Sequence, residues 1–128
     1  MKYHIVKITT TNDNQIVATK VLTPRPLLLR SALRLALRNI AHYMKWDRDP
    51  TIPDFIKNIN LDTRPSQIDL DELQAVNWEP RFLIPESQLR WAVWKLQEDK
   101  RFTVPGHEPD DDYGIQTYTL APVYGRDL

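Results

Sequence analysis

The feature that most constrains the fold is a long apolar periodicity in residues 26–45, "PLLLRSALRLALRNIAHYMK". At 100° per residue its apolar side chains fill an arc of about 200°. A helix with so wide an apolar face packs on more than one side, so we expect it at the centre of the core. Pro26 suits the first helical turn, because proline fixes φ and has no amide hydrogen to satisfy. The apolar residues are Leu28, Leu29, Ala32, Leu33, Leu35, Ala36, Leu37, Ile40, Tyr43 and Met44.

Strand-like segments lie at both ends of the chain. Residues 2–8 and 15–22 are rich in β-branched residues and partly alternate, and the polar "TTTNDN" between them favours a turn, so they predict a β-hairpin. Residues 115–124 alternate in the same way and predict a last strand. A second substantial helix is expected at 86–99, where Pro85 and its neighbour Glu86 suit a first turn.

This order of elements predicts an α+β fold in a single domain that spans the whole chain. A small antiparallel sheet, made of the N-terminal hairpin and the C-terminal strand, is expected to pack against the central long helix and the second helix. Between the helices we expect mostly ordered loop, with a helical turn at 54–59 and a short acidic helix at 65–76. Ser66 and Asp69 in the latter resemble a capping box. Residues 101–114 predict a brief strand followed by an acidic loop.

Composition narrows the class of protein. The chain has no cysteine, which removes disulfides and thiolate chemistry and fits a reducing compartment. We find no run long enough for a signal peptide or a membrane span, so the sequence predicts a cytoplasmic protein. The net charge of zero hides a division: residues 1–46 hold eight Lys or Arg and one acid, giving +7, and residues 47–128 hold nine and sixteen, giving −7. This asymmetry marks either a partner-facing surface or two halves that complement each other.

The helix at 86–99 carries two tryptophans that lie off its core-facing stripe. On a helical wheel, Trp91 and Trp94 point away from the stripe, about 60° apart and beside Arg90 and Lys95. Because exposed tryptophan with arginine is typical of interfaces, the four residues predict a partner-binding surface for another protein or a second copy of the chain. Alternatively, a loop covers both rings, or the rings stack on nucleic-acid bases. The core-facing stripe consists of Leu89, Ala92, Val93 and Leu96.

A second candidate surface is a cationic stripe on the long helix. Arg30, Arg34, Arg38 and His42 recur every four residues with no acid between them, opposite the leucines. Like charges at this spacing repel modestly. Three interpretations stay open: a solvated face, a surface that meets acidic residues, or a grip on nucleic-acid phosphates. The acidic residues could belong to a protein partner or to this chain, where the candidates are Asp69, Asp71 and Glu72.

The sequence offers little catalytic equipment. With only three glycines, it has no Gly-rich phosphate loop, and the G-x-S-x-G motif is absent. The acidic stretch 107–112, "HEPDDD", could supply hard oxygen ligands, but its spacing does not match an EF-hand. A solvated acidic loop is the favoured interpretation. We therefore expect no catalytic residues, no metal site and no cofactor.

Together these features favour a small non-enzymatic protein-binding domain. Such a domain could be an adaptor, a subunit of a complex, or an inhibitor that occludes its partner. The predicted partner is another protein, for which the arginine stripe favours an acidic surface, and a homo-oligomer is compatible with the sequence. The first alternative is a nucleic-acid-binding module that uses the arginine-rich helix face. The second is a carboxylate metal-dependent enzyme.

Overall fold

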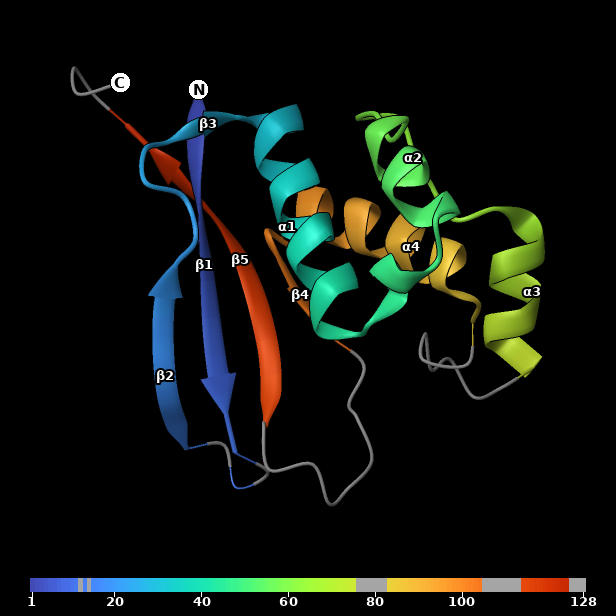
Figure 1. The fold of residues 1–128 in the computed structure, drawn as a ribbon, viewed down its shortest axis with the longest axis horizontal. Helices are drawn as coiled ribbons and strands as arrows, with labels where there is room; N and C mark the ends of the chain where they lie inside the picture. The colour runs from blue at the N-terminus through green and yellow to red at the C-terminus, as the bar shows by residue number, and fades with distance from the viewer. Residues whose placement is uncertain (12, 14, 76–82, 105–113, 125–128) are drawn as a thin grey trace.

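The computed structural model of the protein describes residues 1–11, 13, 15–75, 83–104 and 114–124 (Figure 1). The elements occur in the order β-β-β-α-η-α-α-α-β-β along the chain. In chain order they are β1 (Lys2–Thr10), β2 (Ile16–Val21), β3 (Leu27–Leu28), α1 (Leu29–Tyr43), the 3₁₀ turn η1 (Trp46–Arg48), α2 (Thr51–Lys57), α3 (Gln67–Ala75), α4 (Pro85–Glu98), β4 (Arg101–Thr103) and β5 (Ile115–Val123).

The strands form one antiparallel sheet with β1 near its centre. The strand order is β2-β1-β5-β4, and the short β3 pairs with the start of β1. β1 pairs with β5 along its whole length, from Lys2 opposite Val123 to Thr10 opposite Ile115. The hairpin of β1 and β2 and the C-terminal strand are therefore joined in one sheet, as the sequence predicted, and the α+β fold class is confirmed.

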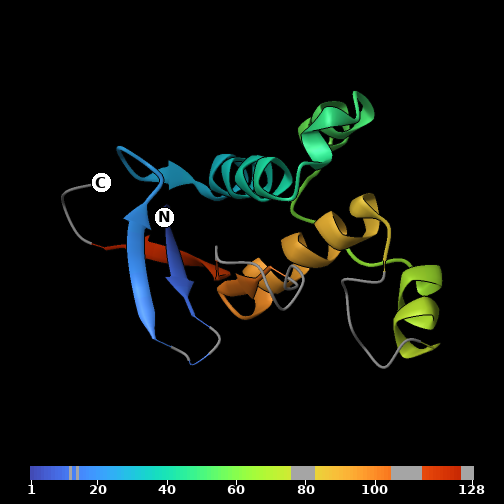
Figure 2. The ribbon, with the colours of Figure 1, turned by 60° about the horizontal axis from the view of Figure 1, so that its bottom comes forward.

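The α-helices of the described chain lie on one side of this sheet, with α1 directly against it (Figures 1 and 2). Side chains alternate between the two faces of a strand. Ile5, Tyr118 and Leu120 point toward the helices and are buried. Their neighbours Val6 and Thr119 point to the opposite face, where they stay partly exposed and no described element covers them. The sheet thus has one packed face and one open face.

Helices α1 and α4 supply most of the core. The predicted stripe of α4 is confirmed, since all four of its residues are fully buried. On α1 the buried side follows the predicted apolar arc, with Leu28 as the exception because it precedes the helix and is 62% exposed. The buried residues of α1 are Ala32, Leu33, Ala36, Leu37, Ile40 and Ala41.

Two predicted helix boundaries were wrong. The long helix begins at Leu29 rather than Pro26, because Leu27 and Leu28 pair with β1 and Leu28 keeps an extended ψ of 152°. The prolines at 24 and 26 favour extended backbone around them, which explains the late start. The turn expected at 54–59 is a helix three residues earlier, because Pro50 precedes its first turn.

Candidate protein-interaction surfaces

Arg90, predicted to bind a partner, is held within the fold. Its guanidinium donates from Nε to Asp69 Oδ2 and from Nη2 to Asp69 Oδ1, both at 3.1 Å. Ser87 Oγ donates to the same carboxylate at 2.5 Å, and Arg90 Nη2 also contacts Ser87 Oγ at 2.9 Å. Because this fork matches the carboxylate with two parallel hydrogen bonds, Arg90 connects α4 to α3. We therefore exclude it from the candidate contact residues.

The carboxylate at the centre of this network also caps α3. Asp69 Oδ2 accepts from the Ser66 amide at 2.9 Å, and the Asp69 amide donates to Ser66 Oγ at 3.1 Å, which is the predicted capping box. Burial raises the pKa of Asp69, but the hydrogen bonds from Ser87, Ser66 and Arg90 outweigh it. Its net pKa is below the ordinary value, so the side chain is ionised at neutral pH.

The two tryptophans of α4 occupy different environments. Trp91 is half-buried and packs against the core cluster, contrary to the wheel that placed both rings away from it. Trp94 is also half-buried, and its ring meets that of Trp91 edge-on with centroids 5.2 Å apart. Lys95 Nζ lies 4.9 Å from the Trp94 centroid and 5.8 Å from that of Trp91. The pair is thus covered in part by its own helix.

An open hollow of about 240 Å³ lies next to Trp91. It is bordered by both apolar and charged groups, and Lys95 and Asp99 on its rim form an ion pair at 3.3 Å. Beyond this ion pair, the lining carries one further charge, that of Arg101. The lining residues are Trp91, Lys95, Asp99, Arg101, Phe102 and Thr103.

The structure divides the cationic stripe of α1. Arg34 is half-buried and its Nη2 donates to the Ile59 carbonyl at 3.5 Å, so it binds the segment after α2. Arg30 and Arg38 are exposed, and neither forms an ion pair with a carboxylate of the described residues. The acidic residues of α3 do not meet the stripe, since α3 lies at the opposite end of the helical layer in both views (Figures 1 and 2). Two arginines thus remain for other contacts.

Arg38 borders a hollow between β2 and α1 that is larger than the one next to Trp91. Its volume is about 410 Å³, and Leu22 and Leu35 give it an apolar part. Lys20 from β2 and Arg38 from α1 contribute cations from opposite sides. Within the described part of the chain, His42 is the lining residue that contacts an acid, with Nδ1 2.8 Å from Asp47 Oδ2. The lining residues are Lys20, Leu22, Leu35, Arg38, Asn39 and His42.

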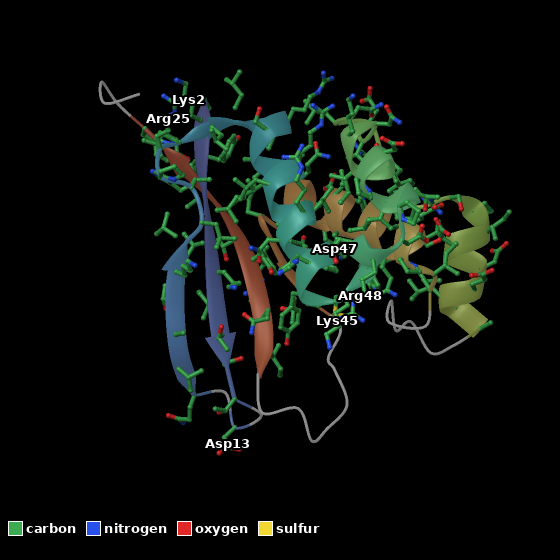
Figure 3. The ribbon with its side chains drawn as sticks, viewed as in Figure 1. Lys2, Asp13, Arg25, Lys45, Asp47 and Arg48 are labelled. Atoms are coloured by element: carbon green, nitrogen blue, oxygen red, sulfur yellow. The ribbon has the colours of Figure 1, made fainter. Side chains whose placement is uncertain are left out.

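A further lysine lies next to this hollow. Lys7 of β1 is the direct cross-strand neighbour of Lys20. Burial, and then the charge of Lys20, lower the pKa of Lys7 from its ordinary value. Of the described acids, Asp47 contacts His42 at the rim of this hollow, and Asp13 lies at the tip of the hairpin (Figure 3). Neither forms an ion pair with Lys7, Lys20 or Arg38. The described residues on the β2–α1 side therefore include three cations without a described carboxylate partner.

The outer edge of β2 is a feature that sequence reasoning missed. All six residues of β2 are exposed, including Ile16 at 68%, Val17 at 60% and Val21 at 54%. β2 pairs with β1 on one side, and no described strand pairs with its other side. The sequence did hold a signal for this edge. A half-buried strand alternates apolar and polar residues, whereas Ile16 and Val17 are two consecutive apolar residues.

The acidic stretch 107–112 lies outside the described residues. Within the described ranges, no three His, Asp or Glu side chains gather as a metal site would need. No helix in the same ranges combines the length and the apolar character of a membrane span.

Comparison of the chain with models of protein families, with curated proteins and with solved structures finds no significant match.

Proposed function

We propose that the chain is a small cytoplasmic protein-binding domain without catalytic activity, and that it binds an extended segment of its partner along the outer edge of β2. The observation that carries this proposal is that all six residues of β2 are exposed and that its outer edge is unpaired in the described structure. An exposed strand edge offers a row of backbone donors and acceptors, and strand addition to such an edge is a recurring mode of peptide recognition.

The register identifies which backbone groups are available. The Leu22 amide donates to the Ile5 carbonyl at 2.8 Å, so Leu22 faces β1. In an antiparallel pair, hydrogen-bonded and non-hydrogen-bonded positions alternate. Lys20 therefore also faces β1, whereas the amides of Thr19 and Val21 point outward. These two residues offer the hydrogen bonds that an added strand would use.

The exposed side chains add apolar contact to this backbone edge. Ile16, Thr19 and Val21 belong to the open face of the sheet, because their cross-strand partners Thr10, Ile8 and Val6 alternate with the buried Ile5. β-Branched residues pack well against similar residues on a neighbouring strand. An added strand would thus bury apolar surface as well as satisfy backbone groups.

The test is a nuclease-treated pull-down from a lysate of the organism that encodes the protein, read by mass spectrometry. The key variant is Thr19→Pro, which removes one outward amide but no hydrogen bond to β1, since proline is tolerated on edge strands. The matched control is Thr19→Ala, which keeps that amide. A protein captured by the wild type and the alanine variant, but lost from a folded proline variant, would support the proposal.

Further variants separate this surface from the others. Capture that survives Thr19→Pro but is lost in Trp94→Ala would move the contact to the tryptophan pair and reject the β2 edge. Trp94 is a better probe than Trp91, because Trp91 packs against the core and its loss would disturb the fold. A parallel pull-down without nuclease provides the comparison. Nucleic-acid-associated proteins that are captured there but lost after nuclease treatment would instead favour the arginine-rich face of α1.

A further inference from the structure

The side chains beside the outer edge of β2 differ between its two faces. Lys20 lies on the face that carries the helices, because its cross-strand neighbour Lys7 is two residues from the buried Ile5 and so points to the same face of β1. Leu22 lies on the same face and lines the hollow between β2 and α1. Thr19 and Val21 lie on the open face. A strand added to this edge would therefore meet cationic surroundings on one face and β-branched residues on the other.

The cations on the helix face have no carboxylate partner among the described residues. Lys7, Lys20 and Arg38 form none of the ion pairs there. The lowered pKa of Lys7, caused by burial and then by Lys20, agrees with two positive charges that face each other on β1 and β2. Like charges on paired strands are unfavourable. An acidic side chain placed between β2 and α1 would offset this repulsion.

The hollow has room and a suitable lining for such side chains. Its volume of about 410 Å³ is open to solvent beside Lys20 and Arg38. Leu22 and Leu35 can contact the methylene groups of a glutamate whose carboxylate reaches the cations. Arg38 offers a planar donor fork that suits a carboxylate.

From these observations we propose that the partner segment is an extended strand in which acidic residues alternate with β-branched apolar residues. Its acidic side chains enter the hollow beside Lys20 and Arg38, and its apolar side chains cover the open face beside Thr19 and Val21. This inference rests on the proposed strand addition to β2, and it specifies the chemistry of the partner.

Charge separates this partner from two other occupants. A second copy paired through β2 would bring a second Lys20 and Arg38 to the same side of the joined sheet, and an inward lysine is a common device against such self-pairing. Nucleic acid would bring phosphates, but the described lining of this hollow holds no Trp, Tyr or Phe ring to stack a base. An acidic strand uses both the cations and the free backbone edge.

The experiment uses three synthetic peptides of alternating sequence, with valine or threonine at every second position. The intervening residues are all glutamate, all glutamine or all lysine. Each peptide is titrated into the ¹⁵N-labelled full chain and followed by backbone NMR, with hydrogen exchange of the Thr19 and Val21 amides as the readout of strand addition. A short single-stranded oligonucleotide is titrated in parallel.

The expected result is that the glutamate peptide binds about tenfold more tightly than the glutamine peptide, weakens with added salt, and protects the outward amides. The lysine peptide should not bind. Lys20→Gln and Arg38→Gln should each reduce the preference for glutamate, whereas Arg30→Gln, an exposed arginine that does not line the hollow, should leave it unchanged. Thr19→Pro should abolish binding, and Thr19→Ala should not.

The other outcomes separate the two proposals. Equal binding of the glutamate and glutamine peptides, with Thr19 and Val21 protected, would overturn the acidic partner and leave strand addition intact. Binding of the glutamate peptide that ignores Thr19→Pro and protects neither amide would reject strand addition, and the acidic strand with it. Shifts at Lys20 and Arg38 caused by the oligonucleotide alone, or binding by none of the peptides, would overturn the acidic strand.

Discussion

Arg90 on α4 and Arg38 on α1 are arginines on the two main helices, yet their surroundings are opposite. Arg90 meets the buried Asp69 through two hydrogen bonds of 3.1 Å and lies over the Phe55 ring. Arg38 is exposed, forms no ion pair with a described carboxylate, and lines a hollow that another cation, Lys20, also lines. The placement of the acidic residues, rather than of the arginines, therefore decides which positive charges stabilise the fold and which remain for a partner.

The same contrast extends to the charge division of the chain. The basic first part holds Lys7, Lys20 and Arg38 on the β2–α1 side, where Asp13 is too far along the hairpin to reach them. In the acidic second part, Asp69 forms an ion pair with Arg90 and Asp99 with Lys95, and both cations belong to that same part. The two halves therefore do not neutralise each other at these positions.

The largest expected effect comes from removing Asp69, the acid that holds Arg90. Asp69→Ala should lower the free energy of unfolding by about 3 kcal/mol, because it leaves Arg90 and Ser87 without their acceptor. Arg38→Ala should change it by less than about 0.5 kcal/mol, as for an exposed side chain without a partner. Urea unfolding of both variants measures the difference. Equal losses would mean that Arg38 also stabilises the fold.

The next effect sharpens the division within α4 itself. Trp91→Ala should cost about 2 kcal/mol, because the ring packs against the core cluster. Trp94→Ala should cost about 1 kcal/mol or less, since its ring contacts Trp91 and Lys95 at the edge of that cluster. Thermal unfolding of the two single variants provides the comparison. A larger loss for Trp94 would contradict the assignment of Trp91 as the core ring.

The contribution of Asp69 to the free energy of unfolding should decrease at acidic pH. The pKa of Asp69 is lower in the folded protein than in the unfolded chain, so the folded state binds fewer protons. Its contribution is complete above the ordinary aspartate pKa and is lost as the pH falls through the folded value. The free energy of unfolding should therefore fall less steeply with acid in Asp69→Asn than in the wild type. If the free energy of unfolding fell equally steeply with pH in both proteins, the pKa of Asp69 would not be lowered by folding.

The smallest expected effect concerns the cationic side. Lys20→Gln should raise the pKa of Lys7 toward its ordinary value, though only in part because burial is the larger cause. It should also stabilise the fold by about 0.3 kcal/mol by removing a cross-strand repulsion. Because the pKa of Lys7 is lowered by folding, wild-type stability should rise as the pH increases through that value. NMR titration of the Lys7 side chain, with Arg30→Gln as control, measures the shift.

Local patterns were sufficient for much of the fold. The hairpin, the capping box of Ser66 and Asp69, and the core stripe of α4 follow from turn composition, cap chemistry and helical period, which act over a few residues. The late start of α1 did not follow, because pairing of Leu27 and Leu28 with β1 is a contact across the sequence. Local propensity yields to such tertiary pairing.

The candidate site was less accessible to sequence reasoning. The arginines of α1 and the tryptophans of α4 were visible as residues off the core stripe. Whether each was free depended on partners far along the chain: Asp69 is 21 residues from Arg90, and Ile59 is 25 residues from Arg34. The hollow between β2 and α1 depends on Lys20 and Arg38, which only the packing of the helix on the sheet brings together.

Near neighbours and periodicity were enough to predict the main helices and strands and their apolar faces. The pairing of charges, the strand that lies at the edge and the position of the hollow became known from the packed fold. These properties depend on distances between segments that the chain order does not specify. The physical reason is that charge pairing and edge exposure are set by the strand order and by the placement of helices, which are decided when the whole core packs.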